Sequence, residues 1–277
     1  MDFIQETDKG RYIPHPILAI FLIFSFFMMS EFVVILLNEW VSPIFYENML
    51  VYFLSSFISL MIILFVWVRF IERRSLVTLG LANERILFLY GKGVLIGFLY
   101  LSICVLILWS FGYLDLSFSL SQPGVFLILP LFVFMIQAAT EEILVRGWLF
   151  PVLAKRMPIL VGAVISSLFF VVAHVLNPNF TWISALNIFL FGMYAVAYSL
   201  KEGGIWGICG WHMVWNFAQI ALFGIPVSGI TPFFDSVLFA SVEGPDYMSG
   251  GNFGVEGSIV LSIVLGIATL YQWIYKK

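Results

Sequence analysis

Eight long apolar segments constrain this chain more than any other feature of its sequence. A bilayer core needs about 20 mostly apolar residues per helix. The segments comprise residues 16–37, 49–68, 93–114, 125–150, 158–176, 182–200, 204–223 and 258–275. They lack the period-two alternation of a transmembrane barrel, and helices then remain as the way to satisfy backbone groups in lipid. We therefore predict an all-α integral membrane protein, with eight transmembrane helices in one bundle and a single domain over residues 1–277.

The composition excludes a water-soluble protein and gives no sign of a nucleic-acid partner. Hydrophobic residues make up 62% of the chain and charged residues only 10%, whereas soluble domains carry about 25% charged residues. The net charge of -3 provides no basic footprint for nucleic acid. The first apolar segment exceeds the 7 to 15 residues or so of a signal-peptide core, so we expect it to be retained as a membrane span.

The basic residues predict an orientation, since Lys and Arg are retained on the cytoplasmic side of a membrane. In an eight-span arrangement all 13 of them fall on one side: before span 1, between spans 2 and 3, at the junction of spans 4 and 5, between spans 6 and 7, and at the C-terminus. The connections 38–48, 115–124, 177–181 and 224–257 contain none. We therefore expect both termini to be cytoplasmic and 224–257 to be an outer loop.

Ionisable residues inside a membrane are costly and indicate function by default. Within the predicted spans they are Glu31, Glu141, Glu142, Arg146, His174 and His212. All except Glu31 fall in spans 4, 5 and 7. We expect Glu31, alone in span 1, to be a structural carboxylic acid hydrogen-bonded to a neighbouring helix.

The fourth span ends in two adjacent carboxylates. Glu142 and Arg146 are four residues apart and share a helix face, so their pairing offsets one buried charge. This pair could be a structural ion pair at the helix end or take a direct part in catalysis, and the spacing leaves both readings open. Glu141 has no obvious partner nearby, which favours a role as general base or acid.

Two further spans each supply a histidine. Spans 4 and 5 are predicted to form an antiparallel hairpin that turns near Arg156. At 1.5 Å per residue, Glu141 and His174 both lie roughly 24 Å from that turn, and we expect them at similar depth. In span 7, His212 and Asn216 share a helix face. Two such donors suit an oxyanion site, although hydrogen bonds between helices would use the same residues.

Together these residues resemble the motifs of the CAAX protease and bacteriocin-processing enzymes, the CPBP or Abi family. The family motifs Glu-Glu-x-x-x-Arg, Phe-x-x-x-His and His-x-x-x-Asn/Asp match Glu141, Glu142 and Arg146, then Phe170 and His174, then His212 and Asn216. The order and the helices are those of the family. The resemblance covers about residues 125–217, which we take as the catalytic core of the domain, and it is less clear for the first spans.

The resemblance implies an intramembrane endopeptidase that hydrolyses a peptide bond in a membrane-associated substrate. In the implied roles, Glu141 and His174 activate water, His212 and Asn216 stabilise the oxyanion, and Glu142 with Arg146 supports them. Candidate substrates are a prenylated CAAX tail, a bacteriocin or pheromone precursor, or a membrane-protein segment. Membrane lipid is an expected partner, and we expect a multi-pass protein of a prokaryotic plasma membrane.

The residues leave the question of a metal cofactor open. Two histidines and a carboxylate are a standard set for catalytic zinc, which makes His174, His212 and Glu141 the candidate ligands. No His-x-x-x-His pair lies on one helix, however. We favour a metal-independent glutamate mechanism, with zinc as the close alternative.

Two functions of other classes compete with the peptidase. One is a non-catalytic immunity or scaffold protein of the same fold. The other is a proton-coupled transporter, because buried Glu and His residues also relay protons.

Overall fold

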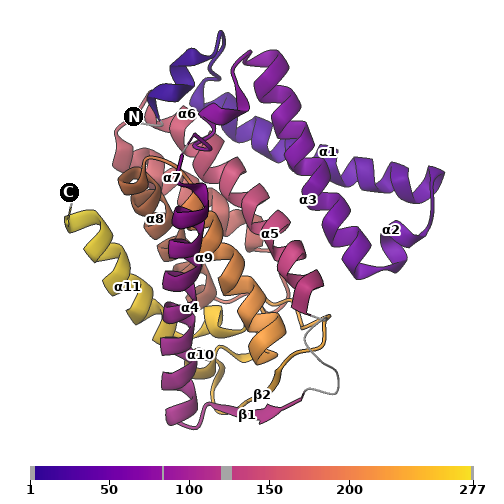
Figure 1. Cartoon of the computed structure of the whole chain (residues 1–277), viewed down its shortest axis with the longest axis vertical. Helices are drawn as coiled ribbons and strands as arrows, with labels where there is room; N and C mark the ends of the chain where they lie inside the picture. Colours follow the sequence, from indigo (N-terminus) through magenta and orange to yellow (C-terminus); the bar gives the residue numbers. More distant parts are fainter. Residues whose placement is uncertain (1–3, 83, 120–126, 276–277) are drawn as a thin grey trace.

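The computed structural model describes residues 4–82, 84–119 and 127–275, and its regular structure is mostly helical (Figure 1). Its α-helices are α1 (Pro16–Trp40), α2 (Ile44–Glu47), α3 (Met49–Val66), α4 (Ile86–Ser110), α5 (Ile128–Glu142), α6 (Phe150–Ala154), α7 (Ile159–His174), α8 (Trp182–Glu202), α9 (Trp206–Phe217), α10 (Asp246–Ser249) and α11 (Ile259–Ile274). The strands are β1 (Leu114–Phe118) and β2 (Leu238–Val242). Residues 125–126 of the predicted fourth span, and Lys276 and Lys277, lie outside the described residues.

Each of the eight predicted spans corresponds to a helix, but not all of these helices are equally suited to cross a bilayer. Five of those described are long and apolar enough: Pro16–Trp40, Met49–Ile71, Ile86–Ser110, Ile128–Ala154 and Trp182–Glu202. Helices α7 and α11 are apolar but shorter. The chain is thus a multi-pass membrane protein, and the count of eight spans stays a prediction.

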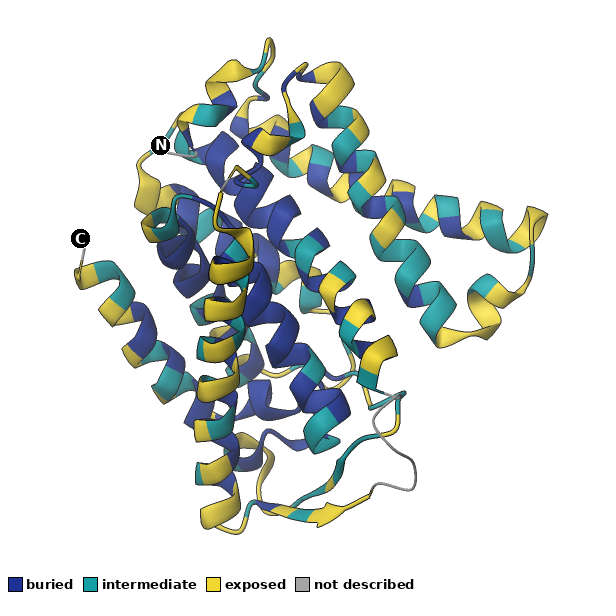
Figure 2. Cartoon of the chain, viewed as in Figure 1, coloured by how far each residue is buried: buried dark blue, intermediate teal, exposed yellow. Residues whose placement is uncertain are grey.

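Helix α9 occupies the centre of the bundle (Figure 1). It packs along α4 on one side and α5 on the other, and every residue from Gly207 to Asn216 is buried (Figure 2). Close approach to α4 depends on glycine, since a Cβ added to Gly97 would lie 2.7 Å from the backbone oxygen of Trp211. A helix covered by protein does not need a fully apolar surface, so α9 can carry the polar residues of the site.

The first and third helices form a hairpin that leans away from this bundle (Figure 1). Glu31 in α1 accepts hydrogen bonds from Tyr52 Oη at 2.9 Å and from Ser56 Oγ at 3.0 Å, both in α3. The expectation that Glu31 is hydrogen-bonded to a neighbouring helix is therefore confirmed. Its carboxyl group holds the hairpin together and does not line the candidate site described below.

A small antiparallel sheet corrects the all-α prediction. Strand β1 pairs with β2, with Leu114 opposite Val242 and Phe118 opposite Leu238. The five residues of β1 alternate between apolar and polar side chains, Leu-Asp-Leu-Ser-Phe, which is the strand period. An alternation over only five residues is not detected when the sequence is searched for apolar segments of about 20 residues. The sheet joins the two connections predicted to lie on the outer side.

Contacts between connecting segments support the predicted alternation of sides. Arg11 N donates to Glu72 O at 2.8 Å, and Lys155 Nζ lies 2.5 Å from Asp8 Oδ2. Ile205 N donates to Gly80 O at 3.1 Å. The N-terminal segment and the joins after spans 2, 4 and 6 therefore meet at one end of the bundle.

The orientation of this end relative to the cell stays a prediction, and it can be measured. We expect a cysteine at position 85 to be protected from a membrane-impermeant maleimide in intact cells and labelled after permeabilisation, because this position belongs to the basic side. A cysteine at Asp115, on the opposite connection, is the matched control and should be labelled in intact cells. Labelling of position 85 from outside would reject the orientation.

Candidate active site

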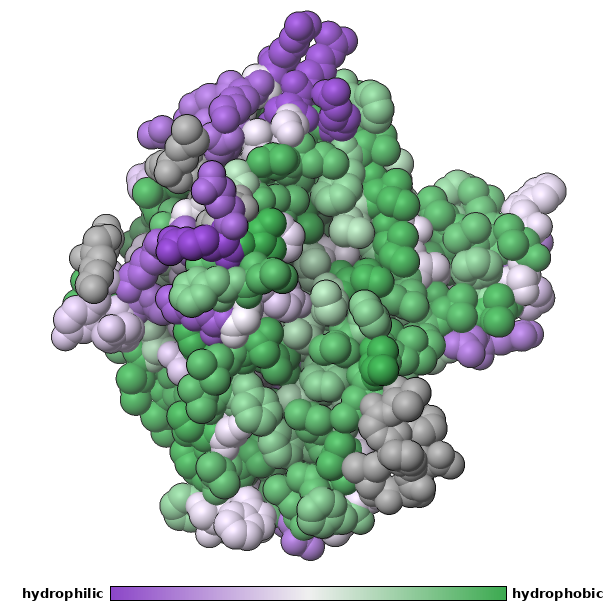
Figure 3. Space-filling model, viewed as in Figure 1, coloured by the Kyte–Doolittle hydropathy of each residue, from purple (hydrophilic) through white to green (hydrophobic). Residues whose placement is uncertain are grey.

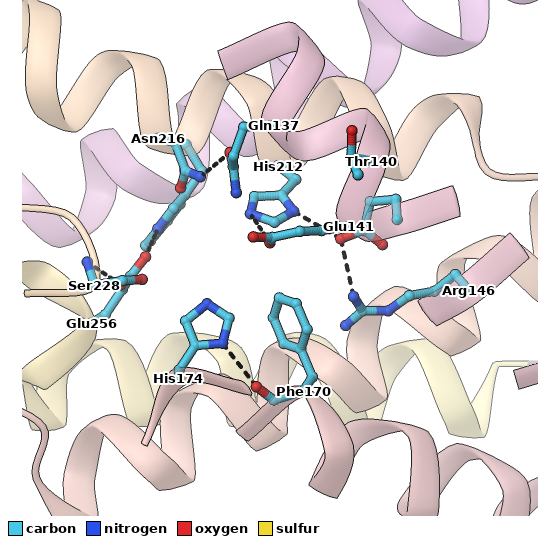
Figure 4. Close-up of polar contacts among 12 residues, drawn as sticks. Gln137, Thr140, Glu141, Arg146, Phe170, His174, His212, Asn216, Ser228 and Glu256 are labelled. Atoms are coloured by element: carbon cyan, nitrogen blue, oxygen red, sulfur yellow. Dashed lines mark hydrogen bonds and ion pairs between the residues drawn. The ribbon is translucent and has the colours of Figure 1, made fainter. Parts of the chain in front are cut away.

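The four residues expected to carry the chemistry line one cavity of about 170 Å³. Glu141 comes from the end of α5, His174 from the end of α7, and His212 and Asn216 from α9. His212 and Asn216 are each only 6% exposed. Figure 4 shows His174 facing Glu141 and His212 across this space. Residues far apart in the sequence are thus brought together, and the expected common depth of Glu141 and His174 is confirmed.

Glu142 and Arg146 form a fully buried ion pair behind the cavity. Arg146 Nη1 lies 3.0 Å from Glu142 Oε1, and both side chains have 0% exposure. The guanidinium also lies over the ring of Phe170, 4.4 Å from its centroid. Neither charged residue lines the cavity. The geometry is that of a supporting pair, with Glu142 turned away from the space that Glu141 borders.

Glu142 also orients a catalytic candidate, His212. Nδ1 of His212 lies 2.8 Å from Glu142 Oε1, and a carboxylate can only accept, so this nitrogen donates. The bond fixes the ring with Nε2 on the side of Glu141. Nε2 lies 3.7 Å from Glu141 Oε2, which is too long for a direct hydrogen bond. Oε2 is buried and has no hydrogen-bond partner among the described residues, so Glu141 retains the capacity to accept a proton or a hydrogen bond.

His174 is held by its own helix. Its Nδ1 lies 2.8 Å from the backbone oxygen of Phe170 and donates to it. In the neutral imidazole the other nitrogen, Nε2, is then an acceptor. Two acceptors, Glu141 Oε2 and His174 Nε2, consequently belong to one cavity, which suits a water molecule that must give up a proton.

The side-chain amide of Asn216 is hydrogen-bonded to a residue that was not predicted from the sequence, Gln137. Asn216 Nδ2 donates to Gln137 Oε1 at 2.8 Å. Gln137 is 5% exposed and lines the cavity one helical turn before Glu141. The four-residue spacing of Gln137 and Glu141 on span 4 was the signal that could have found it. Figure 4 shows the Gln137 amide group between Asn216 and His212.

A second missed residue, Glu256, lies in the connection predicted to be a plain outer loop. Its carboxylate accepts from Trp215 Nε1 at 2.9 Å and from Ser228 N and Oγ at 2.7 and 2.6 Å. Glu256 is 8% exposed. Ser228 lines the cavity, so Glu256 ties this part of the loop to the helix that carries His212. The signal that could have found it is the glycine-rich stretch 250–257 around this acidic residue.

The described residues do not supply a metal site of the usual kind. No group of three or more His, Cys, Asp or Glu side chains among them is close enough together to hold an ion. Nδ1 of His174 donates a hydrogen bond to the backbone oxygen of Phe170, and Nδ1 of His212 donates one to Glu142. Of the candidate ligands, only the two Nε2 atoms and the Glu141 carboxylate face the cavity. These are the donors that a catalytic zinc ion would use, so the metal-independent mechanism and the zinc alternative both stay predictions.

Residues 123–218 match the family described as type II CAAX prenyl endopeptidase Rce1-like. These 96 residues, about a third of the chain, carry the three CPBP motifs, and the match supports the resemblance to that family. The match spans α5, α7, α8 and α9, and so includes every residue that lines the cavity from these helices. This match supports an intramembrane protease of the CAAX type, and it does not favour an immunity or scaffold protein. Comparison with curated proteins finds no match.

Gln137 provides a test of the geometry of this site. We expect Gln137→Met to lower kcat with little change in KM, because Asn216 loses the partner that holds its amide. Removing a direct oxyanion donor costs about 10²- to 10³-fold in kcat, and an indirect role should cost less, about tenfold.

Thr140→Val is the matched control for Gln137→Met. Thr140 is buried on the same helix, and its hydroxyl bonds Ile136 O at 2.8 Å without lining the cavity. Steady-state kinetics of both variants decide the role. Equal kcat values for Gln137→Met and the parent protein contradict it.

Proposed function

We propose that this chain is an intramembrane endopeptidase that hydrolyses a peptide bond in a membrane-associated substrate through water activated by Glu141. The observation that carries the proposal is the cavity with two acceptors, Glu141 Oε2 and His174 Nε2, and a third group, His212, oriented by Glu142. Peptide hydrolysis needs a deprotonated water and a fixed donor for the developing negative charge.

In the proposed first step, water donates to Glu141 and His174 and attacks the carbonyl carbon of the scissile bond. The proton passes to Glu141, and the carbonyl oxygen becomes an oxyanion. His212 acts as an imidazolium in this step: Nε2–H donates to the oxyanion, while Nδ1–H continues to donate to Glu142, 2.8 Å away. Collapse of the tetrahedral intermediate breaks the C–N bond, and Glu141 returns the proton to the leaving amine.

Asn216 and Gln137 have a supporting place in this mechanism. Their side chains border the same space as His212, and each amide group is oriented by the other at 2.8 Å. We propose that the second N–H of Asn216 Nδ2 is the other donor to the oxyanion. Gln137 accepts from the first N–H and holds the amide in place.

The walls of the cavity are aromatic on the side of the leaning hairpin. Phe27 from α1 and Phe53 and Phe57 from α3 line it, together with Phe134 and Phe169. This apolar surface is compatible with a lipidated or membrane-embedded peptide. Among such substrates, we propose a prenylated CAAX tail first, as the family suggests, and a peptide precursor second. We further propose a prokaryotic plasma membrane as the location.

The test is cleavage of a defined reporter by the purified chain in lipid vesicles. The reporter is a farnesylated peptide that ends in a CAAX sequence, and mass spectrometry identifies the products. We expect release of a C-terminal tripeptide. The same peptide without the farnesyl group is the control for the lipid. If neither peptide is cut, peptides that accumulate in cells with an inactive variant identify the substrate class, and accumulation of none contradicts the proposal.

We also expect proteolysis without a metal ion, because no step above passes through one. Treatment with EDTA or 1,10-phenanthroline, followed by removal of the chelator, should leave turnover within about twofold of the untreated enzyme. Elemental analysis of the same active sample gives the zinc content. Stoichiometric zinc, together with loss of activity on its removal and recovery on its return, establishes the zinc alternative and overturns the metal-independent mechanism.

A further inference from the structure

A second cavity, of about 370 Å³, lies apart from the catalytic one and shares no lining residue with it. It is formed by the start of α4, the end of α8 and the last turns of α11. Its lining residues are Arg85, Phe88, Leu89, Lys92, Tyr198, Lys201, Glu202 and Gln272. Nothing in the proposed peptidase mechanism uses this cavity.

The cavity has an excess of positive charge. Arg85, Lys92 and Lys201 face one carboxylate, that of Glu202. Glu202 Oε1 accepts from the backbone N–H of Gly207 at 2.9 Å and so caps the start of α9. Lys92 and Lys201 form no ion pair with any residue that the structure describes. The ammonium of Lys201 lies 5.4 Å from the ring centroid of Tyr271, which leaves its hydrogen-bond donors available.

A buried polar group also lies at this cavity. Tyr198 lines the cavity and is only 6% exposed, yet its hydroxyl group has no hydrogen-bond partner within the described protein. A buried hydroxyl without a partner costs about 1 to 3 kcal/mol.

The surroundings of the cavity indicate where such a group comes from. Phe88 on α4 and Leu270 on α11 are 63% and 62% exposed. In Figure 3, hydrophilic residues gather toward one end of the molecule and border a broad hydrophobic surface. A ligand with an anionic head and apolar chains matches this boundary, because its head can meet the cations while its chains lie against the exposed side chains. Basic pockets between transmembrane helices bind anionic lipid head groups.

We propose that this cavity binds the phosphate of an anionic phospholipid, with Lys92, Lys201 and Arg85 as the cationic contacts. The phosphate lies between α4 and α8, and the acyl chains run along the exposed apolar residues of α4 and α11. Binding there links three helices at the end of the bundle opposite the small sheet.

The experiment measures binding of phosphatidylglycerol to the purified full chain in a neutral detergent, by native mass spectrometry. Phosphatidylcholine with the same acyl chains is the lipid control. We expect phosphatidylglycerol to bind in preference, and the double variant Lys92→Gln/Lys201→Gln to bind it about thirtyfold more weakly, at about five- to sixfold for each lysine. The variant Lys92→Arg/Lys201→Arg should restore binding, because the charge is retained.

Two further arms make the outcome decisive. Lys155→Gln removes a lysine from the same end but outside the cavity, where it pairs with Asp8, and it should leave the affinity within about threefold. An equal loss in Lys155→Gln and in the double variant, or no loss in either, overturns the proposal. Inorganic phosphate is titrated in the third arm. If it competes at millimolar concentration while phosphatidylglycerol is not preferred over phosphatidylcholine, the cavity is a soluble-phosphate site and the lipid proposal fails.

Discussion

Replacing Glu141 by Gln is expected to lower turnover of the reporter peptide by about 10²- to 10⁴-fold, the usual contribution of a general base. Gln keeps the size of the side chain but cannot take a proton from water. The buried Oε2 of Glu141 accepts no hydrogen bond from the described residues, so the substitution breaks no hydrogen bond there and removes only the attraction to His212 Nε2 at 3.7 Å. We expect the unfolding midpoint to stay near that of the parent protein. Initial rates in vesicles and thermal unfolding in detergent measure the two effects.

Glu31→Gln is the matched control for Glu141→Gln. It replaces another carboxylate inside a predicted span, one that accepts hydrogen bonds from Tyr52 and Ser56 and lies outside the cavity. We expect full activity from Glu31→Gln. His174→Ala and His212→Ala should each abolish proteolysis as Glu141→Gln does, since each removes a group that borders the same cavity. Substantial turnover by Glu141→Gln would overturn the assignment of the base.

The second large effect concerns stability. Arg146→Met should destabilise the protein by about 3 to 5 kcal/mol, the cost of breaking a buried ion pair from one side. Glu142 would keep its charge with 0% exposure and would lose the guanidinium 3.0 Å away. The contact of that guanidinium with Phe170 would be lost as well. Thermal unfolding, followed by size-exclusion chromatography of the heated sample, reports the change.

Two companions to Arg146→Met separate charge from packing. In the double variant Glu142→Gln/Arg146→Met no charge is left unpaired, so we expect part of the stability to return. Its activity should stay low, because Glu142 also holds His212 Nδ1. Arg156→Met, at an exposed arginine that donates to Ile13 O, should change the midpoint little. An unchanged midpoint for Arg146→Met contradicts the proposed role of the pair.

Much of the candidate site was predictable from the sequence because each motif lies within one helix. Helical periodicity places Glu142 beside Arg146 whatever the rest of the bundle does, and the structure confirms that pair. The common depth of Glu141 and His174 followed from counting residues back to a single turn. Basic residues and apolar lengths likewise predicted where helices occur, although only some of them meet the length and hydropathy expected of a membrane span.

The remaining features depend on contacts between segments that no local pattern encodes. Asn216 meets Gln137 across two helices, and Glu256 reaches Ser228 through a loop that folds back on the bundle. The partner of His212 could not be chosen from the sequence either, since both adjacent carboxylates were available. The direction in which Glu142 points decides it. The short sheet was missed because its strands were judged against the length of a membrane span.

The arrangement of the buried ion pair has a consequence for how the protein is made. Glu142 and Arg146 lie on one helical stretch, so the pair can form as soon as this stretch leaves the ribosome. His212, the other contact of Glu142, is synthesised 70 residues later. An unpaired charge inside a membrane segment disfavours insertion. Because Arg146 is in the same segment, the carboxylate of Glu142 can be paired before the distant helix with His212 is made. The catalytic cavity is completed later, when the helix that carries His212 packs against the segment in which Glu142 and Arg146 are already paired.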